Sequence, residues 1–247
     1  MDKDKKKQTI KLWVAIFVLV IIILLVISIM IRYEVEGDKN MPFNLSKIIV
    51  VSTAEGEETE GENKWNFDVH QNNDAYIYID KNEDYLGDRQ KTIDSIKIEN
   101  INFTKTPAKG TIETYMPNSV EGRLFTNEAE YLVDGSLEYK SAEESNPQTL
   151  EIGANGGYAV IRFSNSGLGS YSSDDDDEII HDGSLLEKIE VSNEDVQFDV
   201  SFDLVITVDG INYRGTLTLN LPCGNIIEEG TSSLEIADLS SVVFKRE

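Results

Sequence analysis

A continuous apolar segment near the N-terminus constrains this chain more than any other feature. Leu12 to Ile31 has no charged residue, and sixteen of its twenty residues are Leu, Ile, Val or Phe. An α-helix of this length is about 30 Å long, which matches the hydrocarbon core of a bilayer. On the membrane-insertion scale these sixteen side chains favour the bilayer by roughly 5 to 10 kcal/mol. The segment therefore predicts one transmembrane helix over residues 12–31.

The charges on either side of this segment predict its orientation. Five lysines lie within residues 1–11, whereas three basic residues, Arg32, Lys39 and Lys47, follow the segment within a similar distance. The more basic flank of a membrane helix stays in the cytoplasm. A cleaved signal peptide is the alternative, but it needs a shorter apolar core and small residues at a cleavage site. We expect an uncleaved single-pass anchor in the cell membrane, with the N-terminus cytoplasmic and the C-terminal domain extracellular.

The remainder of the chain is strongly acidic. The net charge is −23, and residues 1–31 carry +3 from five lysines and two aspartates, so residues 32–247 carry −26. This charge excludes nucleic acid as a partner, because phosphates require basic side chains. A single cysteine, Cys223, allows no intramolecular disulfide, so core packing must hold the domain together. An extracellular domain without disulfides fits a bacterial envelope.

Beyond residue 47 the pattern predicts β-strands. The clearest signal is an apolar residue at nearly every second position from Val196 to Val208 and again from Ile211 to Leu221, with Asp209-Gly210 between them. A two-residue turn would pair Phe202 with Leu217 and place every apolar side chain on one face. That face must be covered by a second sheet or by helices.

Shorter runs predict further strands. They include residues 48–51, 65–69, 76–79, 96–103, 130–133, 136–139 and 158–163. A change of phase near Asn100 predicts a bulge, and Asp134-Gly135 predicts a hairpin between its two flanking runs. Residues 184–189 predict one short helical turn. Roughly ten to twelve short strands predict an all-β fold class, with a β-sandwich-like domain behind the helix.

The predicted organisation has four parts. They are a basic cytoplasmic tail over residues 1–11, the transmembrane helix over residues 12–31, a juxtamembrane linker over residues 32–46 and an acidic β-rich extracytoplasmic domain over residues 47–247. A division into two β units near residues 140–147 is the alternative.

Acidic residues give two candidate calcium sites. The first set is Asp80, Asn82, Asp84 and Asp88, and the second is Asp174, Asp175, Asp176 and Asp177, before His181. The first set has the spacing of positions 1, 3, 5 and 9 of a calcium loop, but Tyr85 and Lys91 replace the required glycine and bidentate acid. Solvated charged loops explain both sets. We predict no cofactor, with calcium as the alternative.

Catalytic signatures are absent from the sequence. There is no nucleophile elbow, phosphate-binding loop or His-Glu-x-x-His motif. His70 falls on the polar face of its strand, which indicates a solvated side chain. Transpeptidases of the sortase family are similar in architecture, with a β-rich domain behind an anchor. Their Thr-Leu-x-Thr-Cys strand end, however, reads Asn220-Leu221-Pro222-Cys223 here, and the arginine expected shortly afterwards is missing.

We therefore predict a non-enzymatic, membrane-anchored binding or structural module. Its partners would be the bilayer, through residues 12–31, and another envelope protein. The alternative is a membrane-anchored envelope hydrolase or transpeptidase without a recognisable motif. A pocket of convergent carboxylates with shifted pKa values would favour the enzyme, and an exposed apolar patch would favour the module.

Overall fold

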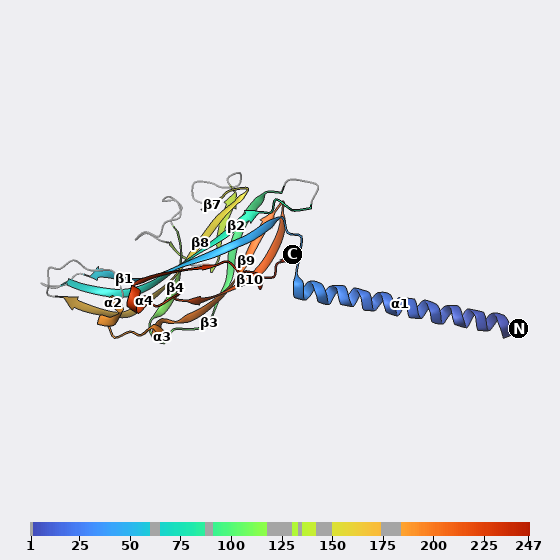
Figure 1. Ribbon diagram of the computed structural model, residues 1–247, viewed down its shortest axis with the longest axis horizontal. Helices are drawn as coiled ribbons and strands as arrows, with labels where there is room; N and C mark the ends of the chain where they lie inside the picture. Colours follow the sequence, from blue (N-terminus) through green and yellow to red (C-terminus); the bar gives the residue numbers. More distant parts are fainter. Residues whose placement is uncertain are drawn as a thin grey trace.

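The computed structural model consists of one long N-terminal helix followed by a mostly β-stranded chain (Figure 1). It describes residues 2–59, 65–86, 91–117, 130–132, 135–141, 150–173 and 184–247. Strands account for 55% of the structure, which agrees with the all-β class predicted for the part after the helix. Residues 142–147, where a division into two units was the alternative, lie outside the described residues.

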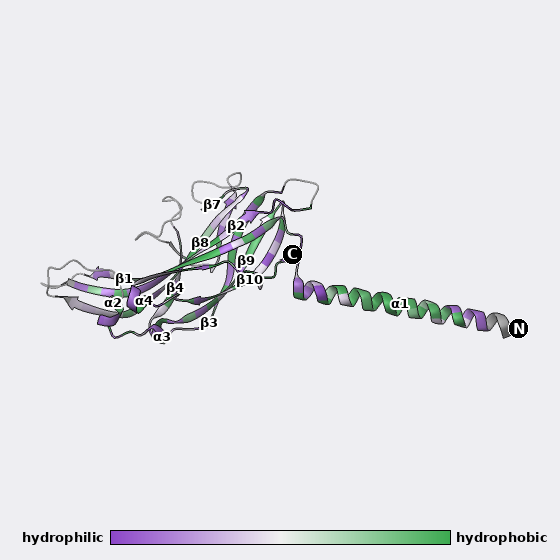
Figure 2. Ribbon diagram, viewed as in Figure 1, coloured by the Kyte–Doolittle hydropathy of each residue, from purple (hydrophilic) through white to green (hydrophobic). Residues whose placement is uncertain are grey.

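Helix α1 (Asp2–Glu36) projects away from the strands, and its middle is continuously hydrophobic (Figure 2). No part of its apolar stretch is buried, and it is the one helix in the described chain that is long and apolar enough to cross a membrane. The helix continues past Ile31 to Glu36, and the first strand begins at Phe43. The connection is therefore only residues 37–42, and it is shorter than the linker expected over residues 32–46.

The described strands form two six-stranded sheets. Sheet A has the order β11-β1-β2-β8-β4-β5, and sheet B has the order β12-β10-β9-β3-β6-β7. Sheet A contains β1 (Phe43–Thr59), β2 (Trp65–Lys81), β4 (Thr111–Met116), β5 (Glu130–Tyr131), β8 (Gly156–Ser173) and β11 (Thr231–Ile236). Sheet B contains β3 (Ile93–Lys105), β6 (Leu137–Ser141), β7 (Leu150–Ile152), β9 (Phe198–Val208), β10 (Ile211–Leu221) and β12 (Lys245–Arg246). All neighbours are antiparallel except β6 and β7.

One hydrophobic cluster receives buried side chains from both sheets. Ile77 and Phe163 come from sheet A, and Ile96, Phe202 and Leu204 come from sheet B. The rings of Phe163 and Phe202 lie 6.2 Å apart between their centroids. Side chains from both sheets therefore contribute to one shared hydrophobic core.

The hairpin of β9 and β10 confirms the predicted register. Phe202 pairs with Leu217, and the turn residues Asp209 and Gly210 have φ angles of 48° and 72°. Two positive φ angles are the signature of the tight turn whose twist matches paired strands. The predicted bulge is also present, because the pairing of β3 with β9 shifts beside Asn100.

Two local predictions were wrong. Val196 belongs to helix α3 (Asn193–Val196) instead of the strand, and the Asp195 carboxylate accepts a hydrogen bond from the Ser192 N–H at 2.9 Å, which favours a helical turn. The runs around Asp134-Gly135 do not form a hairpin, because β5 pairs with β4 in sheet A and β6 pairs with β3 in sheet B. The chain crosses between the sheets there.

A second, smaller cluster lies at the end of the β domain far from α1 (Figure 1). Helices α2 (Ser184–Lys188) and α4 (Ile226–Glu229) contribute buried Leu185, Leu186 and Ile226 to it. Helix α2 confirms the helical turn predicted there. These side chains pack with Ala54 and Val69, so the helices cover the inner face of sheet A where β1 and β2 extend beyond sheet B.

The C-terminal strand holds the base of α1. Phe244 accepts a hydrogen bond through its carbonyl oxygen from the Asp38 N–H at 2.8 Å, and the Arg246 N–H donates to the Tyr33 hydroxyl at 2.9 Å. Lys245 forms an ion pair with Glu34. Residues 244–246 thus join the end of α1 to the β domain.

Replacing Phe202 with alanine should lower the free energy of unfolding by about 3 to 5 kcal/mol, because it empties the centre of the shared core. Thr218→Ala, on the exposed face of β10, should change it by less than about 0.5 kcal/mol. Urea unfolding of the full-length chain in detergent measures both. Equal losses would contradict the inward assignment of Phe202.

Gly37→Ala should loosen the joint between α1 and β12. Gly37 has a φ of +67°, and an added Cβ would lie 2.4 Å from the Phe244 carbonyl oxygen. Gly210→Ala is the matched control, since Gly210 has a φ of +72° and no atom within 4 Å of the added Cβ. Amide hydrogen exchange in residues 238–247 should accelerate only in Gly37→Ala; equal exchange in both variants would contradict the contact.

Candidate functional site

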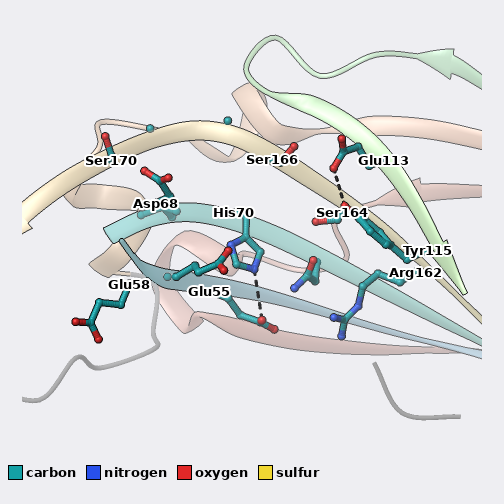
Figure 3. Close-up of a pocket in the computed structure, with 16 residues that line it drawn as sticks. Glu55, Glu58, Asp68, His70, Glu113, Tyr115, Arg162, Ser164, Ser166 and Ser170 are labelled. Carbon is teal, nitrogen blue, oxygen red and sulfur yellow. Dashed lines mark hydrogen bonds and ion pairs between the residues drawn. The ribbon is translucent and has the colours of Figure 1, made fainter. Parts of the chain in front are cut away.

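A groove of about 910 Å³ lies over β1, β2, β8 and β4, on the face of sheet A turned away from sheet B (Figure 3). Alternation along the strands sets this face, because Ala75 and Phe163 point into the core while Asp74, Arg162 and Ser164 occupy the adjacent positions. Its charged or titratable lining residues are Glu55, Glu57, Glu58, Asp68, His70, Glu113, Tyr115 and Arg162.

A break in strand pairing shapes the groove. Val69 pairs with Gly169, but Gln71 pairs with Asn165, so residues 166–168 of β8 lie opposite His70 alone. Extra residues of this kind bend a strand and redirect neighbouring side chains. Gly167 takes a φ of +71° within the bulge. The bulge therefore bends the sheet beside His70, where the groove is found.

The groove contains a partly buried ion pair. The Arg162 guanidinium donates to both carboxylate oxygens of Asp74, at 2.6 and 2.8 Å, and the two side chains are only 18% and 13% exposed. Burial raises the pKa of Asp74, and the neighbouring Arg162 opposes that rise. The two-bond geometry holds Arg162 in one orientation and neutralises its charge.

A second pair lies one strand away. His70 Nε2 is 3.5 Å from a carboxylate oxygen of Glu55, and the Thr53 hydroxyl donates to the other at 2.7 Å. The contact with His70, aided by Thr53, lowers the pKa of Glu55 to about 2. Because of this low pKa, Glu55 stays ionised at every physiological pH.

A further hydrogen bond lies on β4, where the Tyr115 hydroxyl donates to the Glu113 carboxylate at 2.7 Å.

This arrangement can bind charged groups, but it lacks the parts of a nucleophilic relay. Within the described residues, the polar contact of His70 is with Glu55, and no hydroxyl or thiol is hydrogen-bonded to it. Cys223 is 3% exposed and lies away from the groove, against the Ser52 hydroxyl and the Val50 carbonyl. The described residues also hold no group of three or more His, Cys, Asp or Glu side chains arranged to bind a metal.

The described members of the first calcium set, Asp80, Asn82 and Asp84, do not line the groove. Asp80 accepts a hydrogen bond from the Ser46 hydroxyl, while the Asn82 side chain donates to the Met41 carbonyl oxygen at 2.8 Å and accepts from the Asp84 N–H at 3.0 Å. Asn82 therefore stabilises its own turn. Asp88, His181 and the run Asp174, Asp175, Asp176 and Asp177 lie outside the described residues. Calcium binding stays a prediction.

The sequence alone did not identify the groove. His70 does lie on the polar face of its strand, as expected, but it is 24% exposed within a hollow and paired with Glu55. One feature of the sequence could have indicated the groove: Glu55 and Glu57 occupy alternate positions of β1, and Asp68 of β2 lies opposite Glu57. Arg162 gave no signal, because its partner lies 88 residues away.

Comparison of the chain with models of protein families, with curated proteins and with solved structures finds no match. The groove is therefore interpreted from its own geometry.

Glu55→Gln should destabilise the protein at pH 7, and the difference from the wild type should shrink as the pH falls from about 4.5 towards 2. The folded-state pKa of Glu55, about 2, lies below its ordinary value of 4.5, so the ionised form contributes stability above pH 4.5. That contribution is lost as the pH falls through the folded-state value. Urea unfolding across this range measures it, with Glu83→Gln in the exposed turn after β2 as control. A difference independent of pH would contradict the assignment.

Proposed function

We propose that this chain is a single-pass membrane protein whose β domain is held outside the cytoplasm as a ligand-binding module. The groove on sheet A carries the proposal. It is a preformed hollow whose charged groups are held by ion pairs and hydrogen bonds, and its volume of about 910 Å³ lies within the range of ligand sites.

Membrane anchoring is supported by the exposure of α1. Its apolar stretch has no protein covering, and an apolar surface of this size requires a non-aqueous environment. The basic tail before the stretch supports a cytoplasmic N-terminus. Helix α1 and the second cluster lie at opposite ends of the β domain (Figure 1). This arrangement would hold the groove away from the bilayer surface.

A β-sandwich is the proposed form of the domain. The shared cluster supports it, since side chains such as Ile77 of sheet A and Leu204 of sheet B meet in one core. Two sheets that cover each other in this way need no disulfide, consistent with the one cysteine of the chain.

A membrane-anchored hydrolase is the second candidate. One observation favours it: the pKa of Glu55 is lowered while burial raises that of Asp74, and opposed shifts of two carboxyl groups are typical of acid–base pairs. Asp74 nevertheless uses both oxygens to bind Arg162. It is not free to exchange a proton with a substrate, so the binding module is the better-supported function.

Photo-crosslinking in intact cells tests the proposal. A photoreactive residue at Ser170, in the groove, should give a defined adduct, whereas the same residue at exposed Thr218 on sheet B should give none. Protease added outside the cells should digest the domain. Adducts at both positions or at neither, or a domain protected from the protease, would contradict the proposed function.

A further inference from the structure

We propose that β12 and the adjacent end of α1 form a docking surface for the bilayer, in which Arg246 binds the phosphate of a phospholipid headgroup in the outer leaflet. This inference rests on the membrane anchoring in the proposed function and adds a second binding site to it. The site is separate from the groove on sheet A, whose described lining includes no residue of α1 or β12.

Strand β12 contacts α1 just beyond the apolar segment, and Figure 1 shows the C-terminus beside that end of the helix. Lys245 forms an ion pair with Glu34, and the Arg246 N–H donates to the Tyr33 hydroxyl at 2.9 Å. Tyr33 and Glu34 follow shortly after Ile31, at about 3 to 5 Å along the helix. A headgroup layer is about 5 to 7 Å thick on each side of the hydrocarbon core. Because Ile31 ends the apolar segment, α1 meets β12 within the headgroup layer.

Arg246 is oriented by its neighbours and keeps donors for an anion. Its guanidinium carbon lies 5.4 Å from the centroid of the Tyr213 ring, and its Nη2 donates to the Tyr213 hydroxyl at 3.3 Å. The same Nη2 lies 3.2 Å from a carboxylate oxygen of Asp38. The Nε and Nη1 groups have no hydrogen-bond partner among the described residues, and the side chain is 46% exposed. Arginine donors form charge-assisted hydrogen bonds with phosphate oxygens, and stacking on a ring limits the motion of the guanidinium before a phosphate binds.

The charge of this joint favours contact with a membrane surface. The joint between α1 and β12 carries seven charged side chains, from Arg32, Glu34, Glu36, Asp38, Lys39, Lys245 and Arg246. Four are positive and three are negative, so the joint carries +1; because residues 32–247 carry −26 in total, their remainder carries −27. The next residue, Glu247, forms an ion pair with Arg214 on sheet B. Anionic lipid attracts basic side chains and repels acidic ones, so the joint can approach lipid where the acidic remainder cannot.

Photo-crosslinking in phospholipid vesicles tests the position of β12. In the full-length chain, Lys245 and Lys188 are replaced one at a time by a photoreactive lysine analogue that keeps the ammonium group. Lys188 is the matched control, because its ammonium group lies 4.8 Å from the centroid of the Tyr171 ring, at the end of the β domain far from α1. Position 245 should give lipid adducts and position 188 should give none. Absence of an adduct at position 245, or equal adducts at both positions, would overturn the docking surface.

Native mass spectrometry of the full-length protein in non-ionic detergent tests the phosphate site. The probes are phosphatidylglycerol, diacylglycerol with the same acyl chains, and inorganic phosphate. Arg246→Gln should weaken phosphatidylglycerol binding about fivefold, the upper contribution of one exposed ion pair, and should leave diacylglycerol binding unchanged. The control Lys188→Gln also removes one positive charge and should change neither. Equal losses in the two variants, or loss of diacylglycerol binding in Arg246→Gln, would overturn the site. Displacement of phosphatidylglycerol by inorganic phosphate would assign the site to free phosphate and overturn the lipid docking surface.

This inference and the proposed anchoring fail separately. Alkaline extraction of the same vesicles releases proteins that do not span the bilayer. If the protein resists extraction but position 245 gives no lipid adduct, the docking surface is wrong and the anchoring stands. If extraction releases the protein, both are wrong.

Discussion

The hydrophobic core shared by residues of both sheets decides which side chains face outward, and the groove depends on that core. On β2, burial of Ala75 and Ile77 in the shared core leaves Asp74 on the outer face. On β8, burial of Ile161 and Phe163 does the same for Arg162. Because β2 and β8 pair with each other, Asp74 and Arg162 meet at 2.6 Å. The ion pair is a consequence of the hydrophobic core on the opposite face.

The bulge adds the second constraint. A regular ladder would continue the alternation through His70 without a local bend in the strand. The extra residues 166–168 interrupt that ladder and bend the sheet beside His70. The small cluster of Leu185, Leu186 and Ile226 covers the inner face beyond the bend. The same cluster therefore supports the part of β1 and β2 whose outer face carries the acidic groove residues Glu55, Glu57 and Asp68.

Local patterns in the sequence predicted which strands pair only where the two strands are neighbours along the chain. The β9–β10 hairpin followed from apolar alternation and the Asp209-Gly210 turn, since both are local signals. A similar turn at Asp134-Gly135 failed, because the pattern does not say which sheet a strand joins. The groove needed the long-range pairing of β1, β2, β8 and β4, so Glu55 and Arg162 could not be assigned to one site beforehand.

The most direct measurement of an occupied groove outside the membrane is carboxylate labelling on intact cells. A membrane-impermeant carbodiimide with an amine tag, read out by mass spectrometry, should modify Glu83 and Asp84 in the exposed turn after β2. Glu57 and Asp68 should be protected in cells and become reactive in the purified full-length protein. Equal labelling of all four residues in cells would contradict an occupied groove. Absence of labelling at Glu83 and Asp84 would contradict an extracellular domain.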